Sequence, residues 1–367
     1  MGCSIAWHLA SRGCNDVIVI DRGSELGSGS TPRATGGFRC QFNTAVNIRL
    51  SLLSREKLRR FRDEVGSDSG YAPHGYLFLA RTDEAMGQLR EANALQVRNG
   101  VTEARLISAD EARDISPAFE DPSVIGGAFC PTDGFIVATK IMRGYADDAK
   151  RRGVEFRFDT TATAFRVAGH RITDVETTRG EIACDVVVNA AGAWASLLSN
   201  VPITPLRRNV GITVETDVLP ASTPMTIWLD DGYHYRVRDK RVLLVWPDKP
   251  ETSDPYDITF DEQWLRRVVN ATHERVPCLR SVPIDRERCW SGLYEMSPDH
   301  HAILGPATDY ENLFLANGSS GHGVMHSPAI GHVIAEMILD GKTSIDVSDL
   351  RPSRFAEGKA IVSSSLL

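Results

Sequence analysis

The first twenty residues change from one hydrophobic pattern to another. Ile5, Ala6 and Leu9 recur at helical spacing, and Gly13 follows them as a C-cap glycine. Residues 17–20 then form an uninterrupted β-branched run. Such a run is typical of a parallel strand that is covered on both faces, so the pattern predicts a helix followed by a buried strand.

Similar patterns predict helices and strands as far as residue 200. They are a helix over 45–65, a strand over 75–80, a helix over 83–99, a helix that ends at Arg152, a strand in 153–158, and a strand with a small-residue turn over 185–195. The last three resemble a nucleotide-binding layer.

Residues 200–285 have a different pattern. Short segments at 209–216, 233–237 and 241–246 alternate between apolar and polar positions, which predicts an antiparallel sheet.

The section over 312–342 returns to a strand, a Gly/Ser loop and a helix. Ser327 is a natural N-cap with Pro328 at the first helical position, and Gly341 ends the helix.

We therefore expect an α/β fold, α+β overall, in which a Rossmann-like cofactor domain is interleaved with a substrate domain on a mostly antiparallel sheet. The expected cofactor domain comprises 1–44, 135–200 and 286–350, the substrate domain 45–134 and 201–285, and the C-terminal tail 351–367.

Composition narrows the class of protein. A net charge of -7 with scattered Lys and Arg argues against nucleic-acid binding. No apolar run is long enough to cross a bilayer. The seven cysteines form no CxxC pair, so we expect reduced thiols, no metal site and a cytoplasmic location.

Two residues near the start fit half of a GxGxxG fingerprint. Gly2 matches its third glycine, and Asp21 matches the acid that binds a ribose. The first strand and the first two glycines would then be missing from this sequence. A truncated sequence, a start codon assigned too far downstream, and a degenerate apo protein all stay open.

A second glycine-rich loop precedes the helix expected near Ser327. A helix amino terminus there favours negative charge. His322 lies between two glycines that supply no wall for it, so an ordinary packing role explains it poorly.

Four segments together resemble FAD-dependent oxidoreductases of the D-amino-acid oxidase superfamily, in particular its sarcosine oxidase β-subunit-like and dimethylglycine dehydrogenase-like branch. They are "GSGSTPRATGGFRCQF" (27–42), "VVVNAAGAWA" (186–195), "GLYEMSPDHHAILGP" (292–306) and "NGSSGHGVMHSPAIG" (317–331). Their order and spacing match the family along nearly the whole chain.

The resemblance implies that the cofactor is FAD and assigns residues to it. The implied FAD-binding residues are Gly2, Asp21, Arg22, Ser30, Thr31, Arg33, Ala34, Gly36, Gly37, Ala162, Ala191, Gly192, Trp194, Gly292, Gly321, His322, Gly323, Val324 and Met325. The resemblance also implies substrate-side roles for Arg39 and Tyr294, and we count His322 with them. A guanidinium such as that of Arg39 suits an amino-acid carboxylate.

Four positions depart from the family pattern. Arg33 and Gly292 stand where some relatives link FAD covalently through His or Cys, so we expect non-covalent FAD. Leu244 or Val245 stands where oxidases place a lysine over the flavin, which favours a dehydrogenase. Met325 replaces a carboxylate-binding lysine, so sarcosine itself need not be the substrate.

The implied activity is oxidation of a C–N bond in an amino acid or N-substituted glycine, by hydride transfer to flavin and hydrolysis of the imine. The expected partner is a small amine or amino acid, with homo- or hetero-oligomerisation left open. A flavin-binding assembly or partner-binding protein without turnover and an inactive truncated apo form are the alternatives.

Overall fold

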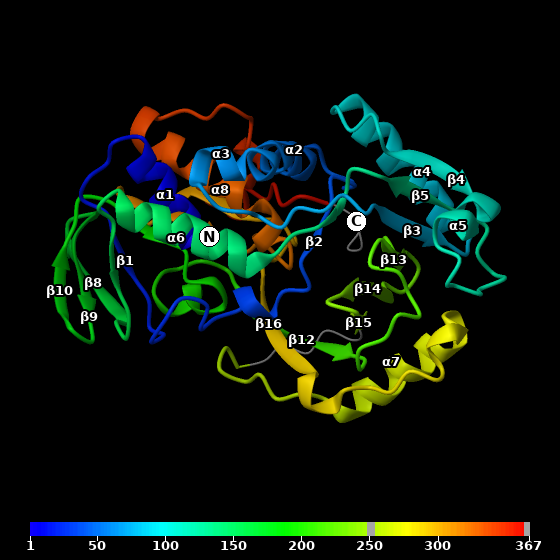
Figure 1. Cartoon of the computed structure of the whole chain (residues 1–367). Coiled ribbons are helices and arrows are strands. Elements are labelled where there is room, and N and C mark those ends of the chain that lie inside the picture. Colours follow the sequence, from blue (N-terminus) through cyan, green and yellow to red (C-terminus); the bar gives the residue numbers. More distant parts are fainter. Residues whose placement is uncertain (248–253, 363–367) are drawn as a thin grey trace.

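The computed structural model describes residues 1–247 and 254–362, and an eight-stranded sheet forms one half of it (Figure 1). Its neighbouring strands are antiparallel except β13 and β3. In spatial order they are β16 (Trp290–Met296), β12 (Thr204–Ile212), β15 (Arg241–Val245), β14 (His234–Arg238), β13 (Met225–Trp228), β3 (Tyr76–Ala80), β5 (Gly126–Cys130) and β4 (Arg105–Ser108). The mostly antiparallel sheet expected from the sequence is confirmed, and β16, from the 286–350 segment, continues it.

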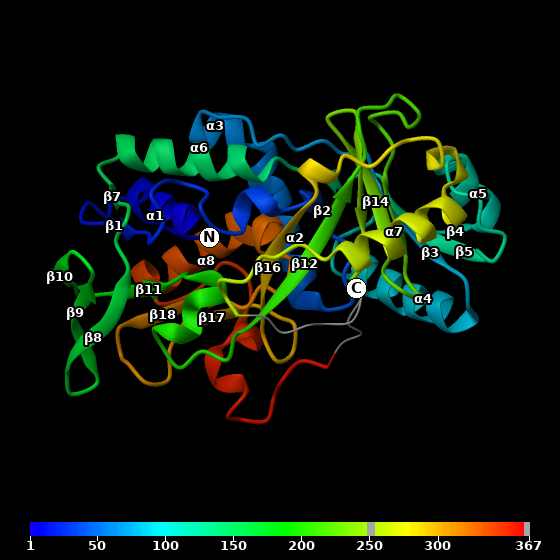
Figure 2. The same cartoon turned by 90° about the horizontal axis from the view of Figure 1, so that it is seen from below.

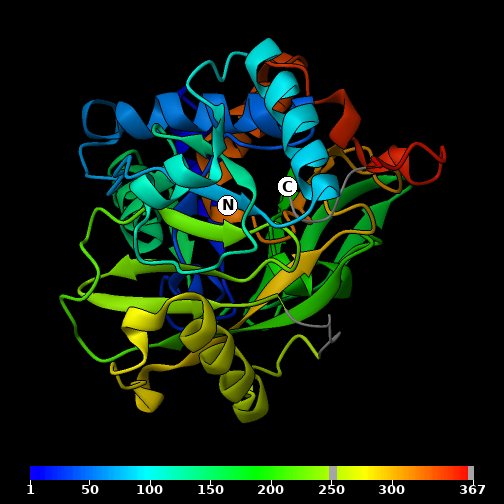
Figure 3. The same cartoon turned by 90° about the vertical axis from the view of Figure 1, so that its right-hand side faces the viewer.

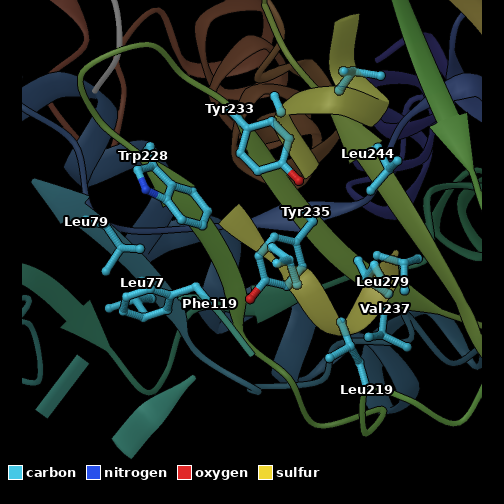
Figure 4. Close-up of a cluster of buried hydrophobic side chains, with 14 of the residues drawn as sticks. Leu77, Leu79, Phe119, Leu219, Trp228, Tyr233, Tyr235, Val237, Leu244 and Leu279 are labelled. Carbon is cyan, nitrogen blue, oxygen red and sulfur yellow. The ribbon is translucent and has the colours of Figure 1, made fainter. Parts of the chain in front are cut away.

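One face of this sheet carries a large hydrophobic core. Leu77, Tyr235 and Leu244 pack there under helix α7 (Glu262–Arg275) and helix α5 (Ala109–Ile115), as Figure 4 shows in part. Side chains alternate along a strand, so the residues between them point the other way. Tyr76 of β3 and Arg236 of β14 therefore share the opposite face.

The other half of the molecule is built from helices and smaller sheets (Figure 2). Helix α1 packs against α6 and α8, and α2 packs against α8. The helices of this half are α1 (Gly2–Ser11), α2 (Ala45–Arg59), α3 (Phe61–Val65), α6 (Ala138–Arg151) and α8 (Gly323–Asp340). Gly331 permits the close approach of α8 to α1, because a Cβ there would lie 2.1 Å from Ser4 Oγ.

Short ladders complete this half. β1 (Ile18–Ile20) runs parallel to β7 (Glu155–Arg157), and β11 (Val187–Asn189) runs parallel to β18 (Leu313–Asn317), which pairs with β17 (Ile303–Pro306). β8 (Ala162–Ala168), β9 (Arg171–Thr177) and β10 (Gly180–Ala183) form a hairpin sheet, and β2 (Gly37–Phe38) pairs with β6 (Gly134–Phe135). Helix α4 (Asp83–Arg98) covers the far end of the large sheet (Figure 3). None of the helices in the described residues is long and apolar enough to span a membrane.

Two local expectations are wrong. The strand predicted to be covered on both faces is only half-buried, and Ile18 is 39% exposed, because β1 lies beside an open cavity. The helix predicted over 45–65 is interrupted at Arg60. That break turns the fully buried Phe61 ring edge-on toward Tyr145, 4.8 Å away.

The start of helix α8 is a third correction. Ser327 is not its N-cap, since the helix begins at Gly323 and contains Pro328. Proline has no N–H to donate to the carbonyl four residues earlier, which here is that of Val324. The Ser327 hydroxyl donates to this carbonyl instead, at 2.8 Å. The helix therefore extends back into the glycine loop.

This substitution of a hydroxyl for a peptide N–H can be tested by a double-mutant cycle. We expect Ser327→Ala to cost about 1 kcal/mol of unfolding free energy, because the Val324 carbonyl loses its donor. Pro328→Ala restores the N–H, so Ser327→Ala should cost little in that background. Denaturant unfolding of the four proteins measures both values, and equal costs in the two backgrounds would refute the explanation.

Candidate active site

A cavity of about 1400 Å³ lies between the two halves of the molecule. Elements from both halves line it, including α1, β1, β11, β16 and the start of α8. All the predicted cofactor residues except His322 line this one cavity, as does Tyr294. Arg39 and His322 lie outside its lining. The sequence candidates thus come together in space, although their individual roles stay predictions.

Two helices begin at this cavity. The first residues of α1 and of α8 line it, with Gly2 at the start of one and Gly323 at the start of the other. Helix amino termini present free N–H groups and partial positive charge. Together they favour an anionic ligand such as a pyrophosphate.

The loop over residues 23–37 forms another wall, and side-chain hydrogen bonds fasten it to β16. Ser30 Oγ donates to the Leu293 carbonyl at 3.0 Å, and Arg33 Nη1 donates to the Ser291 carbonyl at 2.7 Å. Trp290 Nε1 donates back to the Arg33 carbonyl at 2.9 Å. Ser30 and Arg33 were predicted to line the cofactor; in the structure their side chains hold this loop against β16.

Strand β14 holds the end of the same loop. Arg236 Nη1 donates to the Thr35 carbonyl at 2.6 Å, and Arg238 Nη1 donates to the Ala34 carbonyl at 3.3 Å. The Arg236 guanidinium is 6% exposed and lies 3.7 Å from the centre of the Phe135 ring. Burial lowers its pKa to about 9, so it stays charged at neutral pH.

Two glycines let tyrosine rings close in on the site. Gly321 has φ +96°, and a Cβ there would lie 2.6 Å from the Tyr294 ring. A Cβ on Gly37 would lie 2.7 Å from the Tyr76 hydroxyl. The glycine loops therefore also set where these aromatic side chains stand.

Near the cavity wall, two buried polar atoms have no hydrogen-bond partner among the described residues. They are Trp194 Nε1 and Glu295 Oε2. The Glu295 carboxyl lies near the start of α8, where Oε1 accepts a long bond from Ser319 N at 3.4 Å. Burial raises the Glu295 pKa to about 7. Such unpaired groups suit a ligand that carries hydroxyls and other polar atoms, as FAD does, so the residues present fit this cofactor.

The predicted ribose and adenosine residues stand at one end of the cavity. Asp21 follows β1, and its Oδ1 accepts from Gly23 N at 2.8 Å. The Arg22 guanidinium lies 4.1 Å from the centre of the Trp194 ring and 4.9 Å from that of Tyr256. This places a cation beside two aromatic rings at the cavity.

Arg39 is a buried cation beside the cavity. It is 6% exposed, and no carboxylate lies within ion-pair distance among the described residues. Its Nη1 donates to the Gln41 carbonyl at 2.5 Å, and its guanidinium lies 3.9 Å from the centre of the Phe42 ring. The backbone N–H of Arg39 donates to Met325 Sδ at 3.4 Å, which joins it to the cavity wall.

The contact between Arg39 and His322 fixes the histidine's protonation state. Arg39 Nη2 lies 3.1 Å from His322 Nε2. Since a guanidinium only donates, Nε2 accepts, and the ring proton belongs on Nδ1. Burial and then the charge of Arg39 hold the His322 pKa well below its usual value. His322 is therefore neutral, and its basic nitrogen is engaged.

Several residues of this site were not singled out from the sequence. Glu295 lines the cavity, and Tyr76 and Arg236 flank the glycine pair at 36–37. A signal existed for Arg236. Arg236 lies between Tyr235 and Val237 in the middle of β14, and all three residues are buried. Arginine is seldom buried unless it is paired, so an arginine between two such residues of a strand suggests a specific role.

The chain is similar to a family of known proteins. The family model for DAO, FAD dependent oxidoreductase, matches residues 1–337. This chain belongs to that family.

Among solved structures, L-proline dehydrogenase from P. horikoshii is 31% identical, with a TM-score of 0.90 over 97% of this chain and 95% of that one. Glycine oxidase from Geobacillus kaustophilus shares the fold at 23% identity, with a TM-score of 0.84 over 96% of this chain and 95% of that one.

The similar curated proteins include rat mitochondrial dimethylglycine dehydrogenase, 25% identical over 97% of this chain and 44% of its own length. They also include the mouse mitochondrial pyruvate dehydrogenase phosphatase regulatory subunit, 23% identical over 97% of this chain and 42% of its own length. The chain spans less than half the length of these relatives.

The Glu295 carboxyl predicts a pH dependence of stability. Its pKa is raised from 4.5 to about 7 in the folded chain, so between these values the folded chain keeps a proton that the unfolded chain loses. Stability of the cofactor-free protein should therefore fall as pH rises from 4.5 to 7 and stay lower above. Glu295→Gln should flatten this slope and raise the melting temperature at pH 8. Thermal melts at pH 5 and pH 8 check it, and an unchanged slope would contradict it.

The hydrogen bond from Arg236 to the Thr35 carbonyl leads to a second prediction, on cofactor affinity. Arg236→Met removes the donor to the Thr35 carbonyl and loosens the loop, so we expect FAD to bind roughly tenfold more weakly. Arg241→Met is the matched control, because Arg241 donates to the Thr213 carbonyl at 3.0 Å and pairs with Asp285 elsewhere on the sheet. Titration of FAD fluorescence measures both. Equal weakening by the two variants would argue against a specific role of Arg236.

Proposed function

We propose that this chain uses non-covalently bound FAD to oxidise a C–N bond in an amino acid or N-substituted glycine. The observation that carries this proposal is the buried Arg39 guanidinium, which lies beside the cofactor cavity without a carboxylate partner among the described residues. A buried charge is costly unless it is paired, and the carboxylate of an amino acid supplies the pair.

The residues around Arg39 orient such a substrate. The Phe42 ring holds one face of the guanidinium and the Gln41 carbonyl holds Nη1. A fixed planar guanidinium can bind a carboxylate through two parallel hydrogen bonds, which sets the direction of the amine. FAD, when bound, accepts the hydride from the carbon next to that amine.

Among the described residues, the one histidine nitrogen in contact with the Arg39 guanidinium is His322 Nε2, which already accepts from it. His322 is therefore poorly suited to take a proton from the amine, and we expect the amine to reach Arg39 in its neutral form. Turnover at low substrate concentration should then rise with pH as more of the free substrate amine is neutral.

Features of the cavity support a dehydrogenase rather than an oxidase, and non-covalent rather than covalent FAD. Leu244 packs in the hydrophobic core and the apolar Val245 lines the cavity, so neither supplies the lysine of oxidases, which favours a dehydrogenase. Two observations support non-covalent binding. Gly292 and Arg33 offer no nucleophile. Cys289, three residues before Gly292, lies outside the lining of the cavity, and its Sγ donates to the Asp285 carbonyl at 3.4 Å.

The direct test is anaerobic reduction of the FAD-loaded protein. We expect sarcosine, proline or a D-amino acid to bleach the visible flavin band, and dioxygen to restore it slowly. Arg39→Met should raise KM at least tenfold, because the carboxylate loses a charged partner, with Arg39→Lys in between. A flavin-loaded protein that none of these compounds bleaches would overturn the proposal and favour a partner-binding role.

A further inference from the structure

Tyr76 is a buried residue whose hydroxyl the fold does not use. It lies on the face of β3 turned away from the large core, and the residue is 7% exposed. The hydroxyl makes no hydrogen bond within residues 1–247 and 254–362; only the Tyr76 backbone carbonyl is bonded, to Gln41 Nε2 at 3.0 Å. The hydroxyl is therefore free to donate, and a ligand that accepts from it gains a hydrogen bond.

The sequence makes room for this hydroxyl. A Cβ on Gly37 would lie 2.7 Å from the Tyr76 oxygen and 3.1 Å from Met225 Cε. Gly37 has no such atom and also lines the cofactor cavity. The Tyr76 hydroxyl therefore packs against Gly37, a residue of the cavity wall that lies two positions before Arg39 in the chain.

The charges around Tyr76 identify the ligand that it suits. Arg39, Asp133 and Arg236 are the charged groups that act on the pKa of the Tyr76 hydroxyl, and Arg39 acts most strongly. Asp133 is already occupied, because it accepts from Cys40 N at 2.8 Å and from Gln41 Nε2 at 3.2 Å. The ring of Phe78 lies 5.7 Å from that of Tyr76 and 5.5 Å from the Arg39 guanidinium. One aromatic wall thus backs both groups.

We propose that Tyr76 binds the substrate carboxylate together with Arg39, donating its hydroxyl to one carboxylate oxygen while Arg39 pairs with the group. This inference rests on the function proposed above and narrows it. A site with two donors for one carboxylate selects amino acids over simple amines, because an amine without the carboxylate makes neither of these hydrogen bonds.

The hydroxyl is suited to donate at any physiological pH. Burial raises the Tyr76 pKa to about 12, so the oxygen keeps its proton. Tyr294 packs against Gly321 rather than Gly37, and its ring lies 5.9 Å from the Arg208 guanidinium. The two tyrosines therefore stand against different loops, and we expect their effects on binding to be separable.

The experiment measures binding without turnover. Tetrahydrofuran-2-carboxylate and methoxyacetate copy proline and sarcosine with an ether oxygen in place of the amine, so they present the carboxylate but cannot be oxidised at a C–N bond. Titrated into the FAD-loaded protein, they should shift the visible flavin band. Tyr76→Phe should weaken this binding roughly tenfold, while tetrahydrofuran-2-carboxamide should bind weakly to both proteins.

Tyr235→Phe is the matched control. Its hydroxyl lies 3.0 Å from Ser116 Oγ on the opposite face of the same sheet, so its loss should affect stability and leave carboxylate binding within twofold. Gly37→Ala supplies a second test, because the added Cβ displaces the Tyr76 hydroxyl. It should weaken carboxylate binding in the wild type and have little further effect in the Tyr76→Phe protein.

The possible results separate the two proposals. If the wild type binds the carboxylates and Tyr76→Phe binds them equally well, the role of Tyr76 is refuted while the proposed function stands. If the wild type holds FAD but binds no carboxylate, the proposed function fails, and the role of Tyr76 with it. A tenfold loss in Tyr76→Phe, with the flavin spectrum and FAD content retained, supports both.

Discussion

The two-residue period of the eight-stranded sheet is the constraint on which the rest of this structure depends. It sends Tyr235 and Leu244 into the hydrophobic core and leaves Tyr76 and Arg236 to face the cofactor half. A register slip of one residue in β14 would exchange Tyr235 and Arg236 and place a guanidinium in the core. The same packing that stabilises the sheet therefore decides which polar groups the site receives.

Burying polar groups near the cavity lowers the stability of the folded chain. Arg39 is buried without a carboxylate partner in the described chain, and the Glu295 carboxyl has an oxygen without a hydrogen bond. Hydrophobic packing beneath α7 and between the helices offsets the cost. Unpaired buried groups at one cavity are typical of a binding site, since a ligand can satisfy them and bind more tightly for it.

Much of this was predictable from local patterns, and the failures have physical causes. Alternation predicted β12, β14 and β15 of the large sheet, and an apolar run predicted β3, but β4, β5, β13 and β16 were not predicted. Glycine and serine runs predicted the cavity loops. The start of α8 was mispredicted because the Ser327 hydroxyl takes over the bond that Pro328 cannot make. Tyr76 and Glu295 could not be found in this way. Their roles depend on Gly37 and Ser319, to which only the folded chain brings them close.

The fastening of the 23–37 loop also bears on the order of folding. The residues joined by its hydrogen bonds lie far apart along the chain, 201 positions for Arg236 and Thr35 and 263 for Ser30 and Leu293. Contacts of such long range form late, since they require most of the intervening chain to be placed first. We therefore expect the wall formed by this loop to be completed only after the large sheet exists, so that both halves of the molecule assemble before a cofactor can be held.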